Sequence, residues 1–394
     1  MDLDRLLQEL GERGGSDLHL KVNRPPLFRI AGELNPTSYP ELSRAEVQES
    51  VYRIMGPTVQ KKFEESLEGD FSYEIPGLAR FRVNAFVQRG DMGAVFRLVP
   101  LDVPTIDSMG LPQVFKSLCM HPNGLVVVTG PTGSGKSTTL ACMIQHINTT
   151  RPVHVMTIED PIEFVYQDEL STINQRELNI DTFNLSKALR AALRQDPDVV
   201  LMGEMRDLET MRFAVTAAET GHLVFSTLHT NDAKQTLDRV LDTFPADQTK
   251  QVRSQLALVL RGVISQRLVR RSDGTGRIAA VEIMINSPNV RQLIEDGAVR
   301  DIEKAMENDT YYGMQTFNQA LLELVQNGML TEEEAVMNSG APDDLKLGFR
   351  GITRGSTSGE LDMDFSVDAK KAAKKPSSGS QSASDSKVSR GFDF

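Results

Sequence analysis

The hydrophobic and polar positions of the first hundred residues alternate in short runs. In ARFRVNAF, residues 79–86, Phe81, Val83 and Ala85 fall on one side of an extended strand, while Arg80 and Arg82 fall on the other. The runs SDLHLKV and PPLFRIAGEL alternate in the same way, and an amphipathic helix pattern precedes them. The pattern predicts a small α+β domain over residues 1–99.

From about residue 113 the apolar positions instead form short continuous runs separated by longer amphipathic stretches. Continuous runs of this length are expected for parallel strands that are buried on both faces, with helices between them. The runs are GLVVVT, VHVMTI, DVVLM and LVFST. We predict an α/β domain over residues 113–350 that ends in several helices, and the stretch 251–269 is also predicted to be helical.

Two segments lack either pattern. Residues 100–112, PLDVPTIDSMGLP, contain three prolines and are predicted to form an interdomain linker. Residues 351–394 are rich in Ser, Lys, Gly and Asp and contain few large apolar residues. Such a composition predicts a disordered tail.

Composition narrows the classes of function. The net charge of −11 disfavours a chain whose main task is to bind nucleic acid, because phosphates require a basic surface. Two cysteines without a CxxC pair disfavour a disulfide framework or a structural zinc site. No apolar run reaches the roughly 18 to 20 residues that span a bilayer, and the acidic N-terminus is unlike a signal peptide. A reducing, cytosolic location is therefore expected.

The strongest chemical signal is a phosphate-binding loop. Residues 130–137, GPTGSGKS, fit the pattern G-x-x-x-x-G-K-[ST] between a predicted strand and a predicted helix. Backbone N–H groups of such a loop surround a phosphate at the positive end of the helix, the lysine reaches the β and γ oxygens, and the serine hydroxyl binds Mg²⁺. The sequence therefore predicts an ATP and Mg²⁺ site. Its binding residues are Gly130, Pro131, Thr132, Gly133, Ser134, Gly135, Lys136, Ser137 and Thr138.

Acidic residues follow two of the predicted strands. Glu159, Asp160 and Glu163 follow VHVMTI, and Glu204 comes two residues after DVVLM. Ligands of an open α/β sheet gather at the carboxyl ends of its strands, so these carboxylates are expected near the phosphates, where they hold Mg²⁺ or orient water. The alternative for each is a helix N-cap or a solvated turn, which suits Asp160 before Pro161.

Transfer of a γ-phosphoryl group also gains from arginines that stabilise the developing charge. The first domain offers Arg80, Arg82 and Arg97 on predicted strands, although from the residues alone an ordinary polar strand face is the favoured explanation. Arg194, Arg206 and Arg239 are alternatives in the second domain, where surface salt bridges would also account for them.

Four segments in order, GPTGSGKSTT, TIEDPIEF, LRQDPDVVLMGEMRD and ETGHLVFSTLHTNDA, closely resemble the Walker A, Asp box, Walker B and His box of the secretion-type ATPases of type IV pili. The resemblance extends to about residue 350 and includes GGSDLHL and RFRVNAF. GMQTFNQAL and DDLKL are similar to the retraction branch, PilT/PilU. The stretch 289–297, NVRQLIEDG, has Gln292 where the PilT pattern has Asn, and this departure and the extended tail are more like PilU.

The resemblance implies a PAS-like N-terminal domain, a RecA-like P-loop core, and a homohexamer that hydrolyses ATP to drive pilus retraction. It also implies a cytoplasmic position at the inner-membrane base of the pilus, contact with the platform protein there, and, for a PilU-like chain, a paralogous ATPase as partner. Association with the membrane machinery would be peripheral, and no nucleic acid is implied.

By motif match, Glu163 would position the attacking water and Glu204 would act in the Mg²⁺ shell with Ser137. His229 would approach the γ-phosphate, and the arginines of the first domain would include the charge-stabilising ones. His222 lies at the start of the strand that His229 follows. Two roles are open for it: a contact across a subunit or domain boundary, or that of a packed, hydrogen-bonded histidine.

Three other functions compete with retraction. A pilus-assembly or type II secretion ATPase usually carries a four-cysteine zinc insertion, which two cysteines cannot provide. A nucleotide-binding structural subunit is the second alternative, against which the intact Lys136, Glu163 and Glu204 count. A DNA-translocating motor is disfavoured by the acidic charge and by the lack of a basic or aromatic stacking surface.

Overall fold

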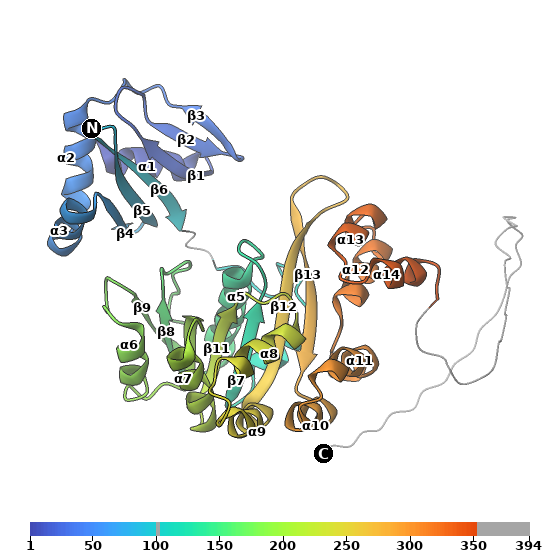
Figure 1. Cartoon of the computed structure of the whole chain (residues 1–394). Helices are drawn as coiled ribbons and strands as arrows, with labels where there is room; N and C mark the ends of the chain where they lie inside the picture. Colours follow the sequence, from blue (N-terminus) through green and yellow to red (C-terminus); the bar gives the residue numbers. More distant parts are fainter. Residues whose placement is uncertain (100–102, 353–394) are drawn as a thin grey trace, which may run out of the picture. The chain divides into compact units, whose positions relative to one another are not determined.

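The computed structural model of the chain describes residues 1–99 and 103–352 (Figure 1). The first part forms an antiparallel sheet of six strands in the order β3-β2-β1-β6-β5-β4. Its strands are β1 Gly15–Leu20, β2 Leu27–Ile30, β3 Glu33–Pro36, β4 Glu68–Ile75, β5 Ala79–Gln88 and β6 Asp91–Val99, and its helices are α1 Leu3–Glu12, α2 Arg44–Ile54 and α3 Pro57–Ser66.

The alternating pattern of β5 separates a buried face from a polar one. Phe81, Val83 and Ala85 are fully buried in one hydrophobic cluster with the four leucines of α1. Helix α1 begins where the Asp2 side chain accepts the backbone N–H of Arg5, which satisfies one of the free donors of the first turn. Burial of these side chains leaves Arg80 and Arg82 on the opposite face of β5, as the sequence predicts.

The second part is built on a mixed sheet of seven strands in the order β13-β12-β7-β11-β10-β8-β9. All neighbouring pairs are parallel except β12 and β13. The strands are β7 Gly124–Thr129, β8 His154–Glu159, β9 Thr172–Glu177, β10 Val199–Glu204, β11 Leu223–Leu228, β12 Leu260–Arg270 and β13 Arg277–Ile285. The helices that accompany them are α4 Val114–Cys119, α5 Lys136–Thr150, α6 Leu185–Ala192, α7 Leu208–Glu219, α8 Ala233–Asp242 and α9 Thr249–Val259.

Both faces of this sheet are covered, which explains the continuous apolar runs. On β7, Leu125 and Val127 pack into a cluster with residues of α7, α8 and α9. Val126 and Val128, on the other face, pack with residues of α4 and α5. The prediction of an α/β fold with buried parallel strands is therefore confirmed.

The prediction of one helix over residues 251–269 is wrong for its second half. Helix α9 ends at Val259, and β12 then pairs with β7 on one side and β13 on the other. The apolar run here serves a strand because Gly262 interrupts it and the β-branched Val263 and Ile264 follow. The polar strand β9, TINQRE, was not predicted.

The C-terminal part of the described chain is helical, as predicted. Its helices are α10 Pro288–Asp296, α11 Ile302–Asn308, α12 Phe317–Gln326, α13 Glu332–Asn338 and α14 Pro342–Phe349, with two short 3-10 helices at Val299–Asp301 and Thr310–Tyr312. Within residues 1–99 and 103–352, no helix has the length and apolar character needed to cross a membrane.

Two predicted segments lie partly outside the described residues. Residues 100–102 of the predicted linker are not described, and residues 103–112 contain neither helix nor strand. Ile106 and Leu111 in this stretch are buried against the core. Of the predicted tail, all but Gly351 and Ile352 falls outside the described residues.

Candidate functional site

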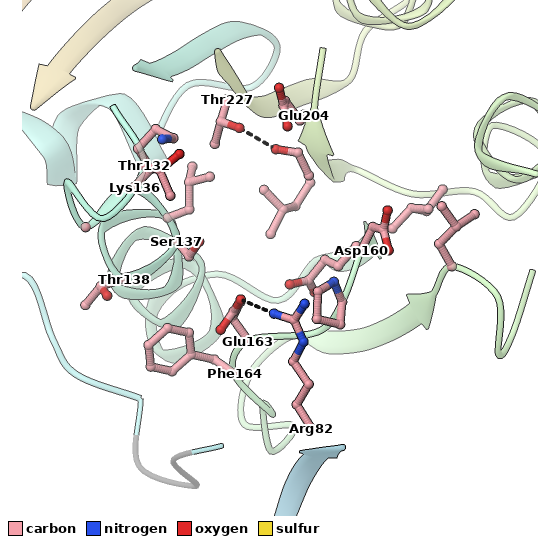
Figure 2. A pocket seen from close by; sticks show the side chains of 18 of the residues that line it. Arg82, Thr132, Lys136, Ser137, Thr138, Asp160, Glu163, Phe164, Glu204 and Thr227 are labelled. Atoms are coloured by element: carbon pink, nitrogen blue, oxygen red, sulfur yellow. Dashed lines mark hydrogen bonds and ion pairs between the residues drawn. The ribbon is translucent and has the colours of Figure 1, made fainter. Parts of the chain in front are cut away.

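A cavity of about 880 Å³ lies at the carboxyl ends of the parallel strands. The first turn of α5, directly after the loop that follows β7, contributes Lys136 and Ser137, and the segment after β8 contributes Glu163. Strand β10 ends in Glu204, and His229 directly follows β11. Figure 2 shows several of these side chains around the same space. The four segments that the sequence singled out for chemistry therefore meet in one place, because parallel strands end at one edge of a sheet.

The loop after β7 has the backbone conformation of a phosphate-binding nest. Gly130, Gly133 and Gly135 have φ values of 140°, 78° and 89°, which L-residues with a side chain rarely adopt. A Cβ on Gly130 would lie 2.3 Å from the carbonyl oxygen of Gln266. Only glycine therefore fits between the loop and β12.

Lys136 opens helix α5 and folds over this loop. Its Nζ donates to the carbonyl oxygens of Gly130 at 2.8 Å and Pro131 at 3.1 Å. Partial burial lowers the pKa of Lys136, and the nearby charge of Glu204 acts in the opposite direction. A phosphate group placed at the start of α5 would face this ammonium, the loop N–H groups and the positive end of the helix.

The predicted loop residues divide into two groups. Gly130, Pro131 and Ser134 do not line the cavity, and Ser134 is buried beneath the loop. Those that line it are Thr132, Gly133, Gly135, Lys136, Ser137 and Thr138.

Glu204 and His229 both line the cavity and lie side by side. The Nε2 atom of His229 is 3.3 Å from Oε1 of Glu204, and Nε of Arg206 donates to Oε2 at 2.8 Å. The Glu204 side chain is 21% exposed, so its charge faces the cavity while two partners fix its orientation. Arg206, one of the alternative arginines, therefore serves to hold Glu204.

The oxygen ligands available here fit Mg²⁺ rather than a metal held by protein alone. Ser137 and Glu204 both line the cavity, and the described residues contain no cluster of three or more His, Cys, Asp or Glu side chains that could hold a metal. Mg²⁺ typically binds one or two protein oxygens and completes its shell with water and phosphate.

Glu163 projects toward Arg82 of β5 (Figure 2). The distance from Arg82 Nη1 to Glu163 Oε1 is 3.8 Å, and both side chains are close to half exposed. Glu159, the last residue of β8, lies near Glu163. Burial raises the pKa of Glu159 to about 7, and hydrogen bonds from Thr157, Gln175 and the Glu163 backbone act in the opposite direction. The buried carboxyl group of Glu159 and the half-exposed carboxyl group of Glu163 thus lie close together at the end of β8.

The three predicted arginines of the first domain do not share one environment. Arg82 and Arg97 line the cavity, and Nε of Arg97 also donates to Asp17 at 2.9 Å. Arg80 does not line it: its Nη2 atom donates to Glu177 at 2.6 Å, and its side chain is only 16% exposed.

His222 lies apart from the cavity. Its Nδ1 is 3.0 Å from the carbonyl oxygen of Ala217, and its own carbonyl accepts the N–H of Gly124 at the start of β7. Within the chain, this is the environment of a packed, hydrogen-bonded histidine.

Gln266 is the clearest residue of the site that the sequence did not predict. It is 3% exposed, its Oε1 accepts the Thr139 hydroxyl at 2.7 Å, and its Nε2 would be 2.8 Å from a Cβ on Gly135. The residue therefore braces the phosphate-binding loop and the first turns of α5. In the sequence, Gln266 is a polar residue within an apolar run. Because that run was predicted to be a helix, the role of Gln266 was not predicted.

Comparison with known proteins shows which family this chain resembles over most of its length. Residues 1–337 match the family model described as type II/IV secretion system protein. The type IV pilus retraction ATPase PilT of Pseudomonas aeruginosa is 49% identical over 87% of this chain and 100% of its own length. A crystal structure of the pilus retraction motor PilT with bound ADP superposes with a TM-score of 0.83 at 44% identity, covering 88% of this chain and 99% of that one.

The comparisons also bear on the choice between the two retraction paralogues. The type IV pilus ATPase PilU of the same Pseudomonas strain is 40% identical over 88% of this chain and 91% of its own length. Identity is therefore higher with PilT than with PilU.

Gly130→Ala tests the close packing between the loop and β12. The added methyl group overlaps the Gln266 carbonyl and forces the loop out of its conformation, so affinity for a fluorescent ADP analogue should fall at least about tenfold. Gly274→Ala is the matched control, because Gly274 also has a positive φ of 72° but has open space around its Cβ position. Equal affinities of the two variants would contradict the assignment of the loop.

Proposed function

The chain belongs to the type II/IV secretion system protein family, and on that basis we propose that it is an ATPase motor that powers type IV pilus retraction and twitching motility. The observation that carries the proposal is the convergence of Lys136, Ser137, Glu163 and Glu204 on one cavity. A phosphate-binding lysine and two carboxylates in this arrangement are the parts that phosphoryl transfer to water requires.

The chemistry follows from the positions of these groups. The loop N–H groups and Lys136 bind the β- and γ-phosphates of ATP, and Ser137 and Glu204 would hold Mg²⁺, which neutralises charge on the phosphate oxygens. Glu163 orients the attacking water and accepts its proton. His229 is held toward the same space by Glu204, where it would contact the γ-phosphate.

Arg82 and Arg97 are the arginines that we propose for charge stabilisation. Both line the cavity, and a guanidinium group there would offset the charge that spreads over the γ-phosphate in the transition state. Arg80 does not line the cavity and pairs with Glu177 instead.

The assembly is proposed from the family. We propose a homohexamer at the cytoplasmic side of the inner membrane, at the base of the pilus, in contact with the platform protein. Residues 1–99 would form the PAS-like domain and residues 113–350 the ATPase core, a division supported by their separate sheets.

The identity of 49% with PilT favours a PilT-like motor. The alternative is a PilU-like accessory ATPase that acts with a PilT partner, for which Gln292 is the favouring observation. An assembly or type II secretion ATPase is less well supported, since the type II secretion ATPase E of Vibrio cholerae is 36% identical to this chain, whereas PilT is 49% identical.

Glu204→Gln separates binding from hydrolysis. The amide keeps the shape of the side chain but loses the negative charge that holds Mg²⁺ and His229, so ATP should still bind while kcat falls at least about a hundredfold. Lys61→Ala, at an exposed lysine of α3, is the control and should hydrolyse ATP at the normal rate. Normal turnover by Glu204→Gln would refute the role of Glu204.

Deletion of the gene tests the direction of pilus movement. Cells that lack a retraction motor should carry excess pili and fail to twitch, and the wild-type gene, but not one encoding Glu204→Gln, should restore twitching. Cells without pili would indicate an assembly motor instead. A defect that is rescued by a paralogous retraction ATPase would indicate the accessory function.

A further inference from the structure

The segment that carries Glu163 has no regular structure of its own. Residues 160–171 join the parallel strands β8 and β9 and contain neither helix nor strand. Backbone hydrogen bonds within a sheet or helix therefore do not fix the position of Glu163. Side chains must do so if the carboxylate is to be held in a productive geometry.

Gln175 of β9 fixes this segment on the C-terminal side of Glu163. Its Oε1 accepts the backbone N–H of Tyr166 at 3.0 Å, and its Nε2 donates to the carbonyl oxygen of Phe164 at 2.8 Å. The same Nε2 is 3.3 Å from Oε1 of Glu159. One amide side chain thus pairs with the segment as a neighbouring strand would.

Glu177, two residues along β9, fixes the segment on the N-terminal side of Glu163. Its Oε2 accepts the backbone N–H of Ile162, the residue directly before Glu163, at 3.3 Å. The side chain of Glu177 is only 3% exposed. A buried carboxylate requires hydrogen-bond donors, so the partners of Glu177 determine whether it stays in place.

Those partners come from β4 and β5. Arg80 donates to Oε2 of Glu177 at 2.6 Å, and the Ser72 hydroxyl donates to Oε1 at 2.7 Å. The carboxylate that receives the Ile162 N–H is therefore compensated by residues about a hundred positions earlier in the chain. Removal of Arg80 would leave a buried charge with too few donors.

We propose that Glu177 is a positioning residue for Glu163, and that Arg80 acts on ATP hydrolysis through Glu177 rather than on the phosphate. Arg80 and Ser72 hold Glu177, and Glu177 together with Gln175 holds the segment on both sides of Glu163. ATP hydrolysis therefore depends on the contact that β4 and β5 make with β9. Movement that separates them would release the segment that carries Glu163, and it would also displace Arg82 of β5 from the cavity. The inference rests on the proposed ATPase function.

A double-mutant cycle on kcat tests this proposal. Glu177→Gln and Arg80→Gln should each lower kcat about tenfold while the KM for ATP and the affinity for an ADP analogue change little, because the binding groups are untouched. The kcat of the double variant should fall by about the same factor as that of either single variant, because both substitutions break the same contact between Arg80 and Glu177. Losses that multiply to about a hundredfold would show that Arg80 acts independently and would overturn the proposal.

Controls separate this effect from a general loss of structure. Asn84→Ala alters the same face of β5 at an exposed site, where the side chain donates a hydrogen bond to Asp70, and its kcat should equal that of the wild type. Ser72→Ala removes a single hydroxyl and provides the same cycle with Glu177 if the Arg80 variant does not fold. An Asn84→Ala variant as impaired as Arg80→Gln would overturn the proposal.

Hydrogen exchange gives a readout that does not depend on turnover. The amide proton of Ile162 should exchange at least about tenfold faster in Arg80→Gln than in the wild type, because its acceptor, Glu177, is no longer held by Arg80. Unchanged exchange would overturn the proposal even if the wild type hydrolyses ATP. Absence of hydrolysis by the wild type would instead refute the proposed function and leave the exchange test standing.

Discussion

The site depends on one constraint, which is that the parallel strands β7, β8, β10 and β11 end at the same edge of the core sheet. Lys136, Glu163, Glu204 and His229 are separated by many residues, yet each follows or ends one of these strands. Burial of both sheet faces fixes the register of the strands, because a shift of one residue would turn apolar side chains away from their cluster. Packing of the core therefore sets the distances within the site.

A second feature is that charged groups at this edge are held by specific partners. Glu204 is fixed by Arg206, Glu177 by Arg80 and Ser72, and Glu159 by Thr157 and Gln175. Unpaired buried charges would be costly, so these hydrogen bonds are needed for the fold as well as for the chemistry. The consequence is that the geometry around Glu163 responds to contacts made outside the cavity.

Sequence patterns predicted the parts of the site that lie in local motifs. The phosphate-binding loop was predicted from its glycines, and the places of Glu163, Glu204 and His229 were predicted from the strands before them. Strand β9 was missed because TINQRE has no apolar run, and β12 was taken for a helix because its run is long. The partnership of Arg80 and Glu177 was missed because 97 residues separate them, and no local pattern records such a contact.

The central claim is that the cavity hydrolyses ATP with Glu163 as the group that activates water. Single-turnover hydrolysis of radiolabelled ATP by Glu163→Gln, with binding of a non-hydrolysable ATP analogue measured on the same sample, tests it most directly. We predict normal binding and a rate of cleavage at least about a hundredfold below that of the wild type. Cleavage at the wild-type rate by a variant that binds normally would contradict the account.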